Sequence, residues 1–387
     1  MSDERWCLIF SDGTGQRGVR DDASALNTNV FRMFLAAEGL PGFEVFYDAG
    51  LGAPPELGDD DEALAAGADS LTRKLRNVWS KATGWGITAN IVECYEALMM
   101  RWEPGMRIGF FGFSRGAYTV RCLGGVLSTC GIATVEGGAP ISRDQDSADA
   151  TRRRRIAEEA VAAYKIRDAA QRRSAGKAFA GKYGAAAVAP DVIGVFDTVK
   201  ALGLPGIMNV VNPYRHEFHD TELSTRVPVG LQALSIDENR KVFAPVLWDD
   251  ASGSGQIIEQ CWFPGVHSDV GGGYGDDNRL ADLALAWMLA RLRSLVGLQI
   301  PIPVTADGKI LGRTHDERTG FGKFWTPGTR SIMAEAVDRA ALCHEIERRF
   351  DGNGYRPPAL GDHPRVAHYY THKAKRVSPE RMAVKPR

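Results

Sequence analysis

The sequence predicts an α/β fold, in which a mostly parallel sheet carries helices on both faces. Short apolar runs end in polar or glycine-rich turns, and stretches with apolar residues at helical spacing follow several of them. The 387 residues are 44% hydrophobic and 25% charged, as in an ordinary globular protein, which excludes a disordered chain. In such a sheet the carboxyl ends of the strands meet at one edge, and the chemistry is expected there.

The strands are placed by their apolar runs. In chain order, the predicted strands cover residues 6–10, 43–48, 107–113, 191–197, 231–237 and 257–265. Helical spacing predicts one helix over 117–131, directly after the third strand, and another over 280–297, after the last one. The residues with catalytic potential follow the carboxyl ends of these strands.

We expect a single domain over residues 1–387. Residues 136–190 interrupt the alternation of strands and helices and are predicted to form a helical insertion, in which 151–182 carry ten Lys or Arg against three Asp or Glu. A solvated helical surface is the simpler interpretation, and peripheral contact with an anionic membrane or an acidic partner is the alternative. An acidic loop at 54–74 and a loose tail at 375–387 complete the expected surface.

Charge and cysteine content exclude several classes of protein. A net charge of −1 provides no general attraction to nucleic acid. The six cysteines form no CxxC pair, so neither a zinc site nor a disulfide framework is indicated. The acidic N-terminus is no signal peptide, and no apolar run is long enough to span a bilayer. We therefore expect a cytoplasmic protein, with secretion independent of a signal peptide as the alternative.

The stretch IGFFGFSRGAY places Ser114 between a predicted strand and a predicted helix. Gly112-Phe113-Ser114-Arg115-Gly116 fits G-x-S-x-G, in which glycines allow the backbone to turn sharply and the serine hydroxyl projects above the sheet edge. The motif alone occurs by chance, but its position between strand and helix is that of a nucleophile elbow. A serine that only caps the helix is the alternative.

A nucleophilic serine needs a general base, and histidine is the usual one. His267 follows a predicted strand and lies in the glycine-rich loop FPGVHSDVGGGYG, which can bring it over the sheet edge. His216 and His219 have aromatic and acidic neighbours and are more typical of loop anchors. The remaining histidines lie in the polar C-terminal region: His315, His344, His363, His368 and His372. His267 is the predicted base.

The acid that orients the base has two candidates. Asp197 ends the strand after the nucleophile, and Asp237 ends the next one. Asp197 is followed by Thr198, which could hold its carboxylate. Asp237 is followed by Glu238, Asn239 and Arg240, which offer it a local ion pair and a structural role. We favour Asp197, with Asp237 as the alternative acid.

Two backbone N–H groups are needed to stabilise the oxyanion of an acyl-transfer intermediate. One is expected from Arg115, the residue after the nucleophile. The other is expected from the loop SDGTG after the first strand, where Gly13 or Thr14 is the predicted donor. Asp12 could instead brace that loop.

Other chemistries fit the motifs less well. FSDGTG resembles the D-x-D-G-T motif of haloacid-dehalogenase-like phosphatases, but Phe10 replaces its leading aspartate. GGGYGDD lacks the lysine and the spacing of a phosphate-binding loop. A metal site is conceivable from these four side chains: Asp12, Asp197, His267 and Asp269. We predict no metal and no cofactor.

Taken together, the motifs resemble one family. Its blocks appear here as SDGTGQ, LNTNVFRMF, YDAGLG, GFSRGAYTVRCLGG, GVFDTVKALG, ALSIDENRKVFAPVLW and WFPGVHSDVGGGY. They resemble the domain of unknown function 2235, an α/β-hydrolase domain shared with the Tle1-like phospholipase effectors of bacterial type VI secretion. The resemblance implies a hydrolase whose nucleophile, acid and base are Ser114, Asp197 and His267. Gln232 stands where the family pattern would have a histidine, and Gln16 stands where asparagine is frequent.

These observations predict an α/β-hydrolase-like serine hydrolase that cleaves carboxylic esters, in a lipid or phospholipid, through an acyl-enzyme. Two alternatives stay open. One is a hydrolase-fold protein that binds lipid or a partner without turnover. The other is a metal-dependent phosphoesterase, which a chelator would inactivate.

Overall fold

The computed structural model describes residues 4–16, 18–20, 26–50, 84–144, 147–199, 222–249, 255–319, 323, 325–330, 332 and 340–371. Several features named above lie outside the described residues: the acidic loop 54–74, His216, His219, His372 and the tail 375–387.

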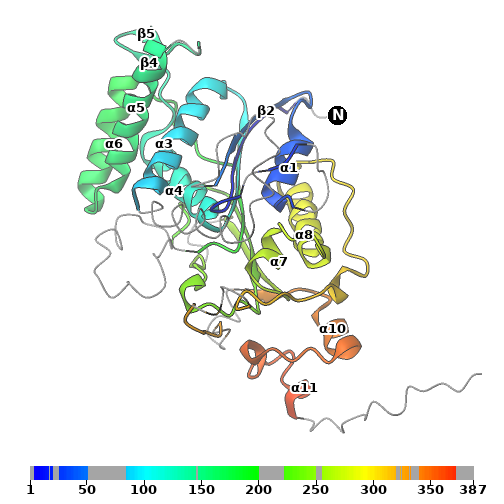
Figure 1. Cartoon of the computed structure of the whole chain (residues 1–387). Helices are drawn as coiled ribbons and strands as arrows, with labels where there is room; N and C mark the ends of the chain where they lie inside the picture. Colours follow the sequence, from blue (N-terminus) through cyan, green and yellow to red (C-terminus); the bar gives the residue numbers. More distant parts are fainter. Residues whose placement is uncertain are drawn as a thin grey trace, which may run out of the picture.

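A parallel sheet forms the centre of the described chain (Figure 1). Its seven strands lie in the order β2-β1-β3-β6-β7-β8-β9, and each neighbouring pair is parallel. The strands are β1 (Trp6–Ser11), β2 (Phe43–Asp48), β3 (Arg107–Phe113), β6 (Val192–Phe196), β7 (Val229–Ser235), β8 (Ile257–Phe263) and β9 (Ala341–Leu342). The strand order reverses direction at β1, because β2 lies on one side of β1 and β3 on the other. This is the type of position at which open α/β sheets carry their sites.

Helices cover both faces of the sheet. On one face lie α3 (Gly84–Arg101), α4 (Ser114–Cys130), α5 (Ser147–Lys165) and α6 (Ala169–Tyr183). On the other face lie α1 (Asn29–Ala37) and α8 (Arg279–Val296). The mostly parallel sheet with helices on both faces confirms the predicted α/β-hydrolase-like fold class.

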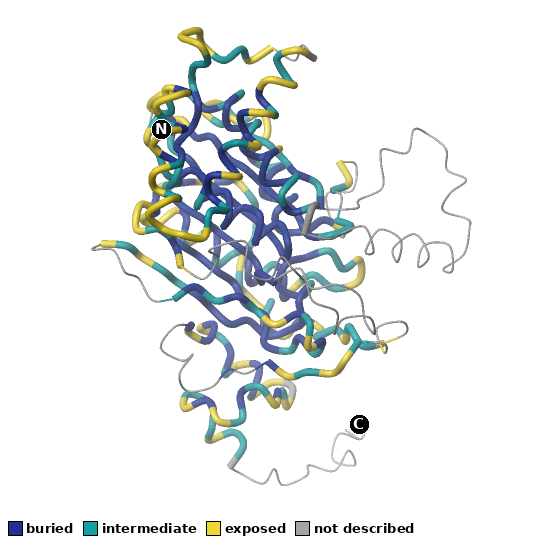
Figure 2. The backbone as a smooth tube through the Cα atoms, turned by 90° about the vertical axis from the view of Figure 1, so that its left-hand side faces the viewer, coloured by how far each residue is buried: buried dark blue, intermediate teal, exposed yellow. Residues whose placement is uncertain are grey.

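The alternation of side chains along β1 explains the two-sided packing. Trp6, Leu8 and Phe10 belong to the core beneath α1 and α8, whereas Cys7 and Ile9 belong to the core beneath α3, α4 and α5. Successive strand residues point to opposite faces, so a fully apolar strand requires cover on both. Figure 2 shows the buried backbone running through the middle of the molecule.

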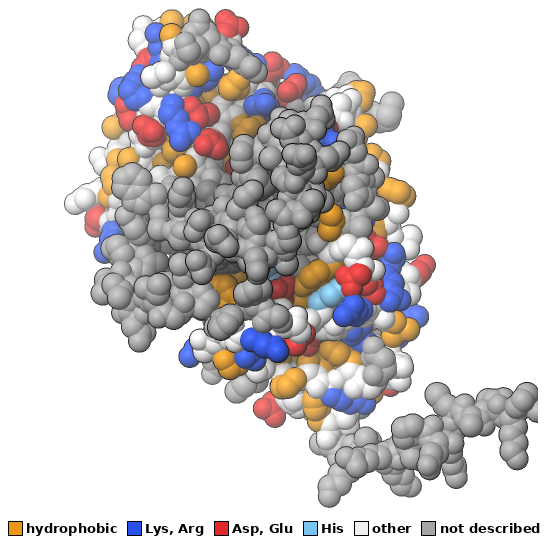
Figure 3. Space-filling model, in the orientation of Figure 1, with side chains coloured by type: hydrophobic (Ala, Val, Ile, Leu, Met, Phe, Trp, Pro, Cys, Tyr) orange, Lys and Arg blue, Asp and Glu red, His pale blue; other side chains and the backbone are white. Residues whose placement is uncertain are grey.

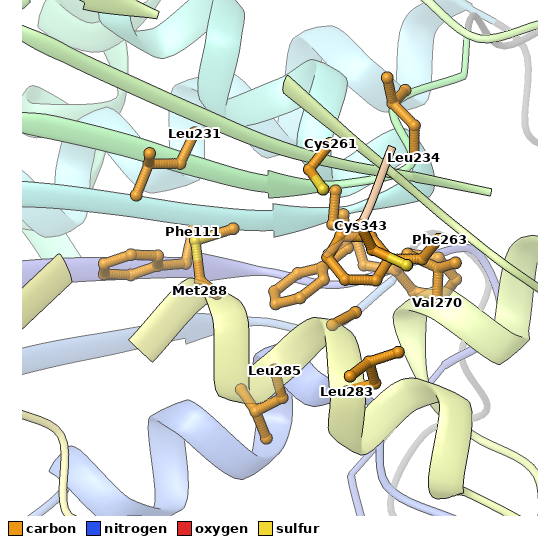
Figure 4. Close-up of a cluster of buried hydrophobic side chains, with 14 of the residues drawn as sticks. Phe111, Leu231, Leu234, Cys261, Phe263, Val270, Leu283, Leu285, Met288 and Cys343 are labelled. Atoms are coloured by element: carbon orange, nitrogen blue, oxygen red, sulfur yellow. The ribbon is translucent and has the colours of Figure 1, made fainter. Parts of the chain in front are cut away.

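Large apolar side chains fill the core on the α8 side (Figure 4). Met288 of α8 lies beside Phe111 of β3, and Leu285 of α8 and Leu231 of β7 belong to the same core; all four are fully buried. Burying a leucine, methionine or phenylalanine side chain contributes about 1.5–3 kcal/mol each. This packing fixes the sheet whose carboxyl edge carries the candidate site.

The remaining elements are short or peripheral. They are β4 (Val135–Glu136), β5 (Ala139–Pro140), α7 (His267–Gly271), α10 (Ile346–Asn353), α11 (His368–Thr371) and the 3-10 turns Lys241–Phe243, Lys309–Leu311 and Pro358–Leu360. Among the helices within the described ranges, none combines the length and apolar character needed to cross a bilayer.

Within residues 136–190, helices α5 and α6 form an antiparallel pair that packs on α3 and α4. The basic side chains there are partly neutralised by glutamates: Arg154 pairs with Glu96, and Lys182 pairs with Glu159. In Figure 3, basic and acidic side chains are intermixed over this part of the surface. Exposed pairs of this kind contribute little stability, about 0–1 kcal/mol each.

Candidate active site

Ser114 lies at the sharp turn between β3 and α4. Its φ of 57° is in the left-handed region, which a non-glycine residue rarely adopts. A Cβ on Gly112 would lie 2.6 Å from the Cα of Ala117, and a Cβ on Gly116 would lie 2.1 Å from the carbonyl oxygen of Ser11. Only glycine fits either position, because the helix starts directly against the strands. The backbone at Ser114 is thus held in a strained conformation of the kind found at functional sites.

His267 is the first residue of α7 and lies over the same sheet edge. Its Nε2 is 2.8 Å from Ser114 Oγ, and its Nδ1 is 2.5 Å from Asp197 Oδ2. The imidazole packs against two rings: Phe113 at 4.7 Å and Phe243 at 5.1 Å between centroids. Both ring nitrogens are therefore engaged, and the aromatic contacts fix the plane of the ring.

Asp197 follows β6 directly and completes the hydrogen-bond series. It is fully buried, and its φ of 42° is again in the left-handed region. Oδ1 accepts the backbone N–H of Ser235 at 2.9 Å, and Oδ2 accepts the Ser235 hydroxyl at 3.3 Å. Thr198, which we expected to hold this carboxylate, instead donates to Gln232 at 2.6 Å. The structure thus brings Ser114, His267 and Asp197 together, while Ser235 takes the role expected of Thr198.

Arg330 contacts Asp197 and was not singled out from the sequence. Its Nη1 lies 2.6 Å from Asp197 Oδ1, and its Nη2 lies 2.8 Å from Oδ2. Burial alone would raise the pKa of Asp197, but the positive charge of Arg330 and the hydrogen bond from His267 outweigh it and hold that pKa well below its usual range. The carboxylate is therefore kept ionised. No local pattern in the sequence pointed to Arg330, because it lies 133 residues from its partner.

Asp237, the alternative acid, makes other contacts. Its Oδ2 accepts the backbone N–H of Gly265 at 2.6 Å and the hydroxyl of Tyr355 at 2.8 Å. Burial raises its pKa. The local ion pair that we expected to involve Asp237 forms instead between Glu238 and Arg240, at 2.7 Å. Asp237 thus braces the loop between β8 and α7.

Glu238 holds the backbone of His267 in place. Its Oε2 accepts the backbone N–H of His267 at 3.2 Å. Burial would raise the pKa of Glu238, but the positive charges around it, Arg240 foremost, lower it overall. The Arg240 guanidinium also lies 3.7 Å from the centroid of Phe243, the ring that packs on His267. One ion pair therefore steadies both the backbone and the aromatic wall of the base.

The loop after β1 lies beside Ser114, as expected for an oxyanion loop. A Cβ on Gly13 would be 3.3 Å from the Cβ of Ser114. The N–H of Gly13, however, already donates to Asp12 Oδ1 at 2.7 Å. Asp12 also accepts the hydroxyls of Thr28 and Tyr47, at 2.7 and 2.8 Å. Asp12 therefore braces the loop, and this geometry favours Thr14 over Gly13 as the donor from this loop.

Arg115, the other predicted donor, is the second residue of α4. Backbone N–H groups in the first turn of a helix point out along the axis and stabilise negative charge. Burial lowers the pKa of its side chain to about 10, so the guanidinium is still positive at neutral pH. The backbone N–H groups at the start of α4 therefore favour negative charge beside Ser114.

The four side chains considered for a metal site do not converge. Asp197 and His267 face one another, whereas Asp12 belongs to the β1 loop network. Asp269 accepts from His315, whose Nδ1 lies 2.5 Å from its Oδ1. Over the described ranges, no group of three or more His, Cys, Asp or Glu side chains is arranged to hold a metal ion.

Gln232, which departs from the family pattern, belongs to a buried network behind the site. Its amide nitrogen donates to the Val246 carbonyl at 3.1 Å and to Gln260 Oε1 at 2.9 Å. Its oxygen accepts from Thr198 and from Arg121. The amide can donate and accept at once, so it links β7 to β8 and to the residue after Asp197.

Comparison with known proteins matches most of this chain to a family. The model described as "T6SS, Phospholipase effector Tle1-like, catalytic domain" matches residues 5–291. Among curated proteins, the uncharacterized protein YEL023C of Saccharomyces cerevisiae is 32% identical over 108 residues, which are 27% of this chain and 15% of that protein.

Three solved structures are also similar. An uncharacterized protein from Pseudomonas aeruginosa is 20% identical, with a TM-score of 0.39 over 79% of this chain and 48% of that one. The Tle1 effector bound to the VgrG spike of the type VI secretion system is 17% identical, with a TM-score of 0.36 over 70% and 51%. Acyl-protein thioesterase 2 of Zea mays is 11% identical, with a TM-score of 0.29 over 75% and 94%. This chain spans about half the length of the first two.

Proposed function

Since the chain belongs to the family of the Tle1-like type VI secretion phospholipase effector catalytic domain, we propose that it is a serine hydrolase that cleaves a carboxylic ester of a lipid. The observation that carries this proposal is the hydrogen-bond series from Ser114 Oγ through both nitrogens of His267 to Asp197. A nucleophile, a base and an orienting acid in such a series are what acyl transfer requires.

In the first half-reaction, Ser114 Oγ attacks the acyl carbonyl carbon while His267 Nε2 accepts the hydroxyl proton. The ionised Asp197 holds Nδ1–H and stabilises the imidazolium that forms. The carbonyl oxygen becomes an oxyanion, which the backbone N–H groups of Arg115 and Thr14 stabilise. The intermediate then collapses, the ester C–O bond breaks, and the departing alcohol takes the proton from Nε2.

In the second half-reaction, water replaces the alcohol. His267 Nε2 takes a proton from water, whose oxygen attacks the acyl carbon of the Ser114 ester. The second oxyanion collapses, the bond to Ser114 Oγ breaks, and the proton on Nε2 returns to Oγ. A free carboxylic acid leaves, and the serine hydroxyl is restored. These steps use side chains and backbone N–H groups of this protein together with water.

A fluorophosphonate probe tests the nucleophile. It phosphonylates an activated serine, so wild-type protein is expected to be labelled and Ser114→Ala is not. Ser128→Ala is the matched control, because Ser128 lies on the same helix and its buried hydroxyl has no hydrogen-bond partner within the described residues. Equal labelling of wild type and Ser114→Ala would end the proposal.

Measurements of ester hydrolysis separate a serine hydrolase from a metal-dependent phosphoesterase. We expect hydrolysis of p-nitrophenyl esters and release of fatty acid from phospholipid vesicles, both abolished in Ser114→Ala. A chelator should leave both activities unchanged. Loss of activity with the chelator and its recovery with added metal would favour the metal-dependent phosphoesterase.

The basic segment 151–182 supports a second candidate function, peripheral binding to anionic lipid. Arg173 and Lys177 on α6 are exposed, and so is Lys182, which pairs with Glu159. A cluster of basic side chains near a membrane surface contributes about 1 kcal/mol per residue. Binding to vesicles that contain phosphatidylserine, measured with the doubly substituted Arg173→Gln/Lys177→Gln protein as comparison, tests this function independently of Ser114.

A further inference from the structure

The carboxylate of Asp197 receives an unusually complete set of donors. Besides His267 and Ser235, both terminal nitrogens of Arg330 reach it, one to each oxygen. Arg330 comes from the segment 325–330, which lies beyond the last residue of the family match at 291. A residue outside the matched region thus contacts the acid of the proposed hydrolase directly.

The two charges form a buried bidentate pair. The Arg330 side chain is 3% exposed and that of Asp197 is 0% exposed. Two parallel N–H···O bonds between a guanidinium and a carboxylate fix the orientation of the carboxylate plane and stabilise its negative charge. Nη2 also donates to the carbonyl oxygen of Phe243 at 2.8 Å, the residue whose ring packs on His267. Arg330 therefore touches both the acid and the loop that forms the wall of the base.

The placement of Arg330 is poorly explained by stability alone. Its Nε is buried without a hydrogen-bond partner among the described residues. Leaving a buried donor unsatisfied costs about 1–3 kcal/mol, and burying an ion pair is often no better than burying apolar groups. The geometry is instead well suited to holding one carboxylate in a defined plane and charge state.

We propose that Arg330 is a positioning residue for catalysis, which holds the carboxylate of Asp197 in plane with the imidazole of His267 through its bidentate contact. Arg330 does not contact Ser114 and acts through Asp197. The inference rests on the proposed serine-hydrolase function and extends it to the C-terminal segment, beyond the family match.

The pH dependence follows from charge. Arg330 and His267 bond to the same oxygen, Asp197 Oδ2, so a positive charge on Arg330 opposes a second one on the neighbouring imidazole. Removing it makes the imidazole easier to protonate and moves the acid limb of the kcat/KM profile to higher pH, by about one pH unit. The charged and titratable groups around the imidazole are Asp197, Arg330, Glu238, Arg240, Asp269 and, through Asp269, His315.

The test compares Arg330→Met, which removes the charge, with Arg330→Lys, which keeps it without the bidentate geometry. Hydrolysis of a water-soluble p-nitrophenyl ester is measured from pH 5 to 9. For Arg330→Met we expect kcat to fall about 10²-fold with little change in KM, and the acid limb to shift upward. For Arg330→Lys we expect a smaller fall in kcat and an acid limb close to that of wild type.

Arg349→Gln is the matched control. Arg349 is also a buried arginine of the C-terminal segment, but it donates to the carbonyl oxygens of Ile310 and Gly312. The Arg349→Gln substitution should lower the melting temperature and leave the pH dependence of kcat/KM unchanged. Millimolar guanidinium should partly restore kcat to Arg330→Ala and should leave the kcat of Arg349→Ala unchanged.

The outcomes are separable. If wild-type protein neither reacts with a fluorophosphonate nor hydrolyses esters, the proposed function itself fails. If wild type is active and Arg330→Met keeps both its kcat and its acid limb while losing only thermal stability, the positioning role is overturned. Should Arg330→Met not fold, Arg330→Lys decides: a reduced kcat with an unshifted acid limb supports the role, and wild-type kcat overturns it.

Discussion

The carboxyl ends of β6 and β7 lie next to each other in the sheet, and each is followed by an aspartate with different surroundings. Asp197 follows β6 immediately, in a left-handed conformation, and points at His267. Asp237 comes two residues after the end of β7 and bonds to Gly265 and Tyr355. Arg330 keeps the first carboxyl ionised, whereas burial raises the pKa of the second.

The difference shows that the end of a strand supplies a position, and that the neighbours of that position determine the chemistry. At the end of β6 a cation and a histidine meet one carboxylate. At the end of β7, Asp237 and Glu238 hold the loops around the base through backbone N–H groups. We interpret the β6 end as the reacting side of the site and the β7 end as its support.

Exchanging each acid for its amide gives the largest expected difference. Asp197→Asn removes the charge that stabilises the imidazolium and holds its tautomer, and we expect kcat/KM to fall about 10³–10⁴-fold. Asp237→Asn keeps an oxygen that can accept from Gly265, and we expect less than a tenfold change. Steady-state hydrolysis of a p-nitrophenyl ester measures both.

Thermal unfolding of the two amide variants provides the control, since both must be folded at the assay temperature. A loss of activity in Asp237→Asn equal to that in Asp197→Asn, with both proteins folded, would contradict the assignment of the acid to the β6 end.

Breaking the ion pair behind His267 tests the supporting role of the β7 end. Glu238→Gln leaves Arg240 with a neutral amide on one side and its second partner, Glu317, at 3.2 Å, so we expect the free energy of unfolding to fall by about 1.5–3 kcal/mol. Urea unfolding monitored by tryptophan fluorescence measures this loss. Because the backbone N–H of His267 can still donate to the amide oxygen, kcat should fall less than in Asp197→Asn. A change in activity without any change in stability would indicate that Glu238 acts on the chemistry.

Much of this comparison could be predicted from the sequence. The strands and the elbow were accessible because buried parallel strands are continuous apolar runs, and because Gly112 and Gly116 have no room for a side chain. The predicted end of β7 was less accurate, because the strand covers Val229–Ser235 and so ends two residues before the predicted residue 237. Ile236 is buried just beyond the end of the strand, so hydrophobicity alone could not mark where strand pairing stops.

The partners of the acids could not be predicted, for a physical reason. Arg330 and Tyr355 reach Asp197 and Asp237 from segments more than 100 residues away, and no local periodicity encodes such a contact. Proximity in the sequence instead suggested Thr198 as the partner of Asp197, a role that Ser235 takes in the structure. Side-chain networks between distant loops depend on the complete fold.

The carboxyl ends of β1 and β2 carry two further buried carboxyls, Asp12 and Asp48, whose side-chain partners within the described residues are neutral. Burial raises the pKa of Asp12 to about 6 and that of Asp48 to about 7. A raised folded-state pKa means that the native protein binds a proton that the unfolded chain, with an ordinary carboxyl pKa near 4, releases. The free energy of unfolding should therefore fall between about pH 4 and pH 7, by several kcal/mol for the two carboxyls together.

Asp48→Asn tests this sign. The amide can still accept from Ser11 and removes one of the two titrating groups, so the slope of stability against pH should become shallower. Urea titrations at pH 4.5 and pH 7 measure it. A slope that is unchanged in Asp48→Asn would show that Asp48 titrates normally, and that its neighbourhood stabilises a charge as the end of β6 does.

Tyr355→Phe probes the support at the β7 end with the smallest expected effect. The hydroxyl of Tyr355 donates to Asp237, and its loss removes a hydrogen bond to a buried carboxyl, which costs about 1 kcal/mol. Because Asp237 retains the Gly265 N–H, the loop before α7 should keep its position, and kcat should stay within twofold of wild type. Unfolding and ester hydrolysis measured on the same preparation separate the two effects. A fall in kcat larger than the loss of stability can explain would mean that the β7 end transmits its geometry to His267, so that both strand ends would act in catalysis.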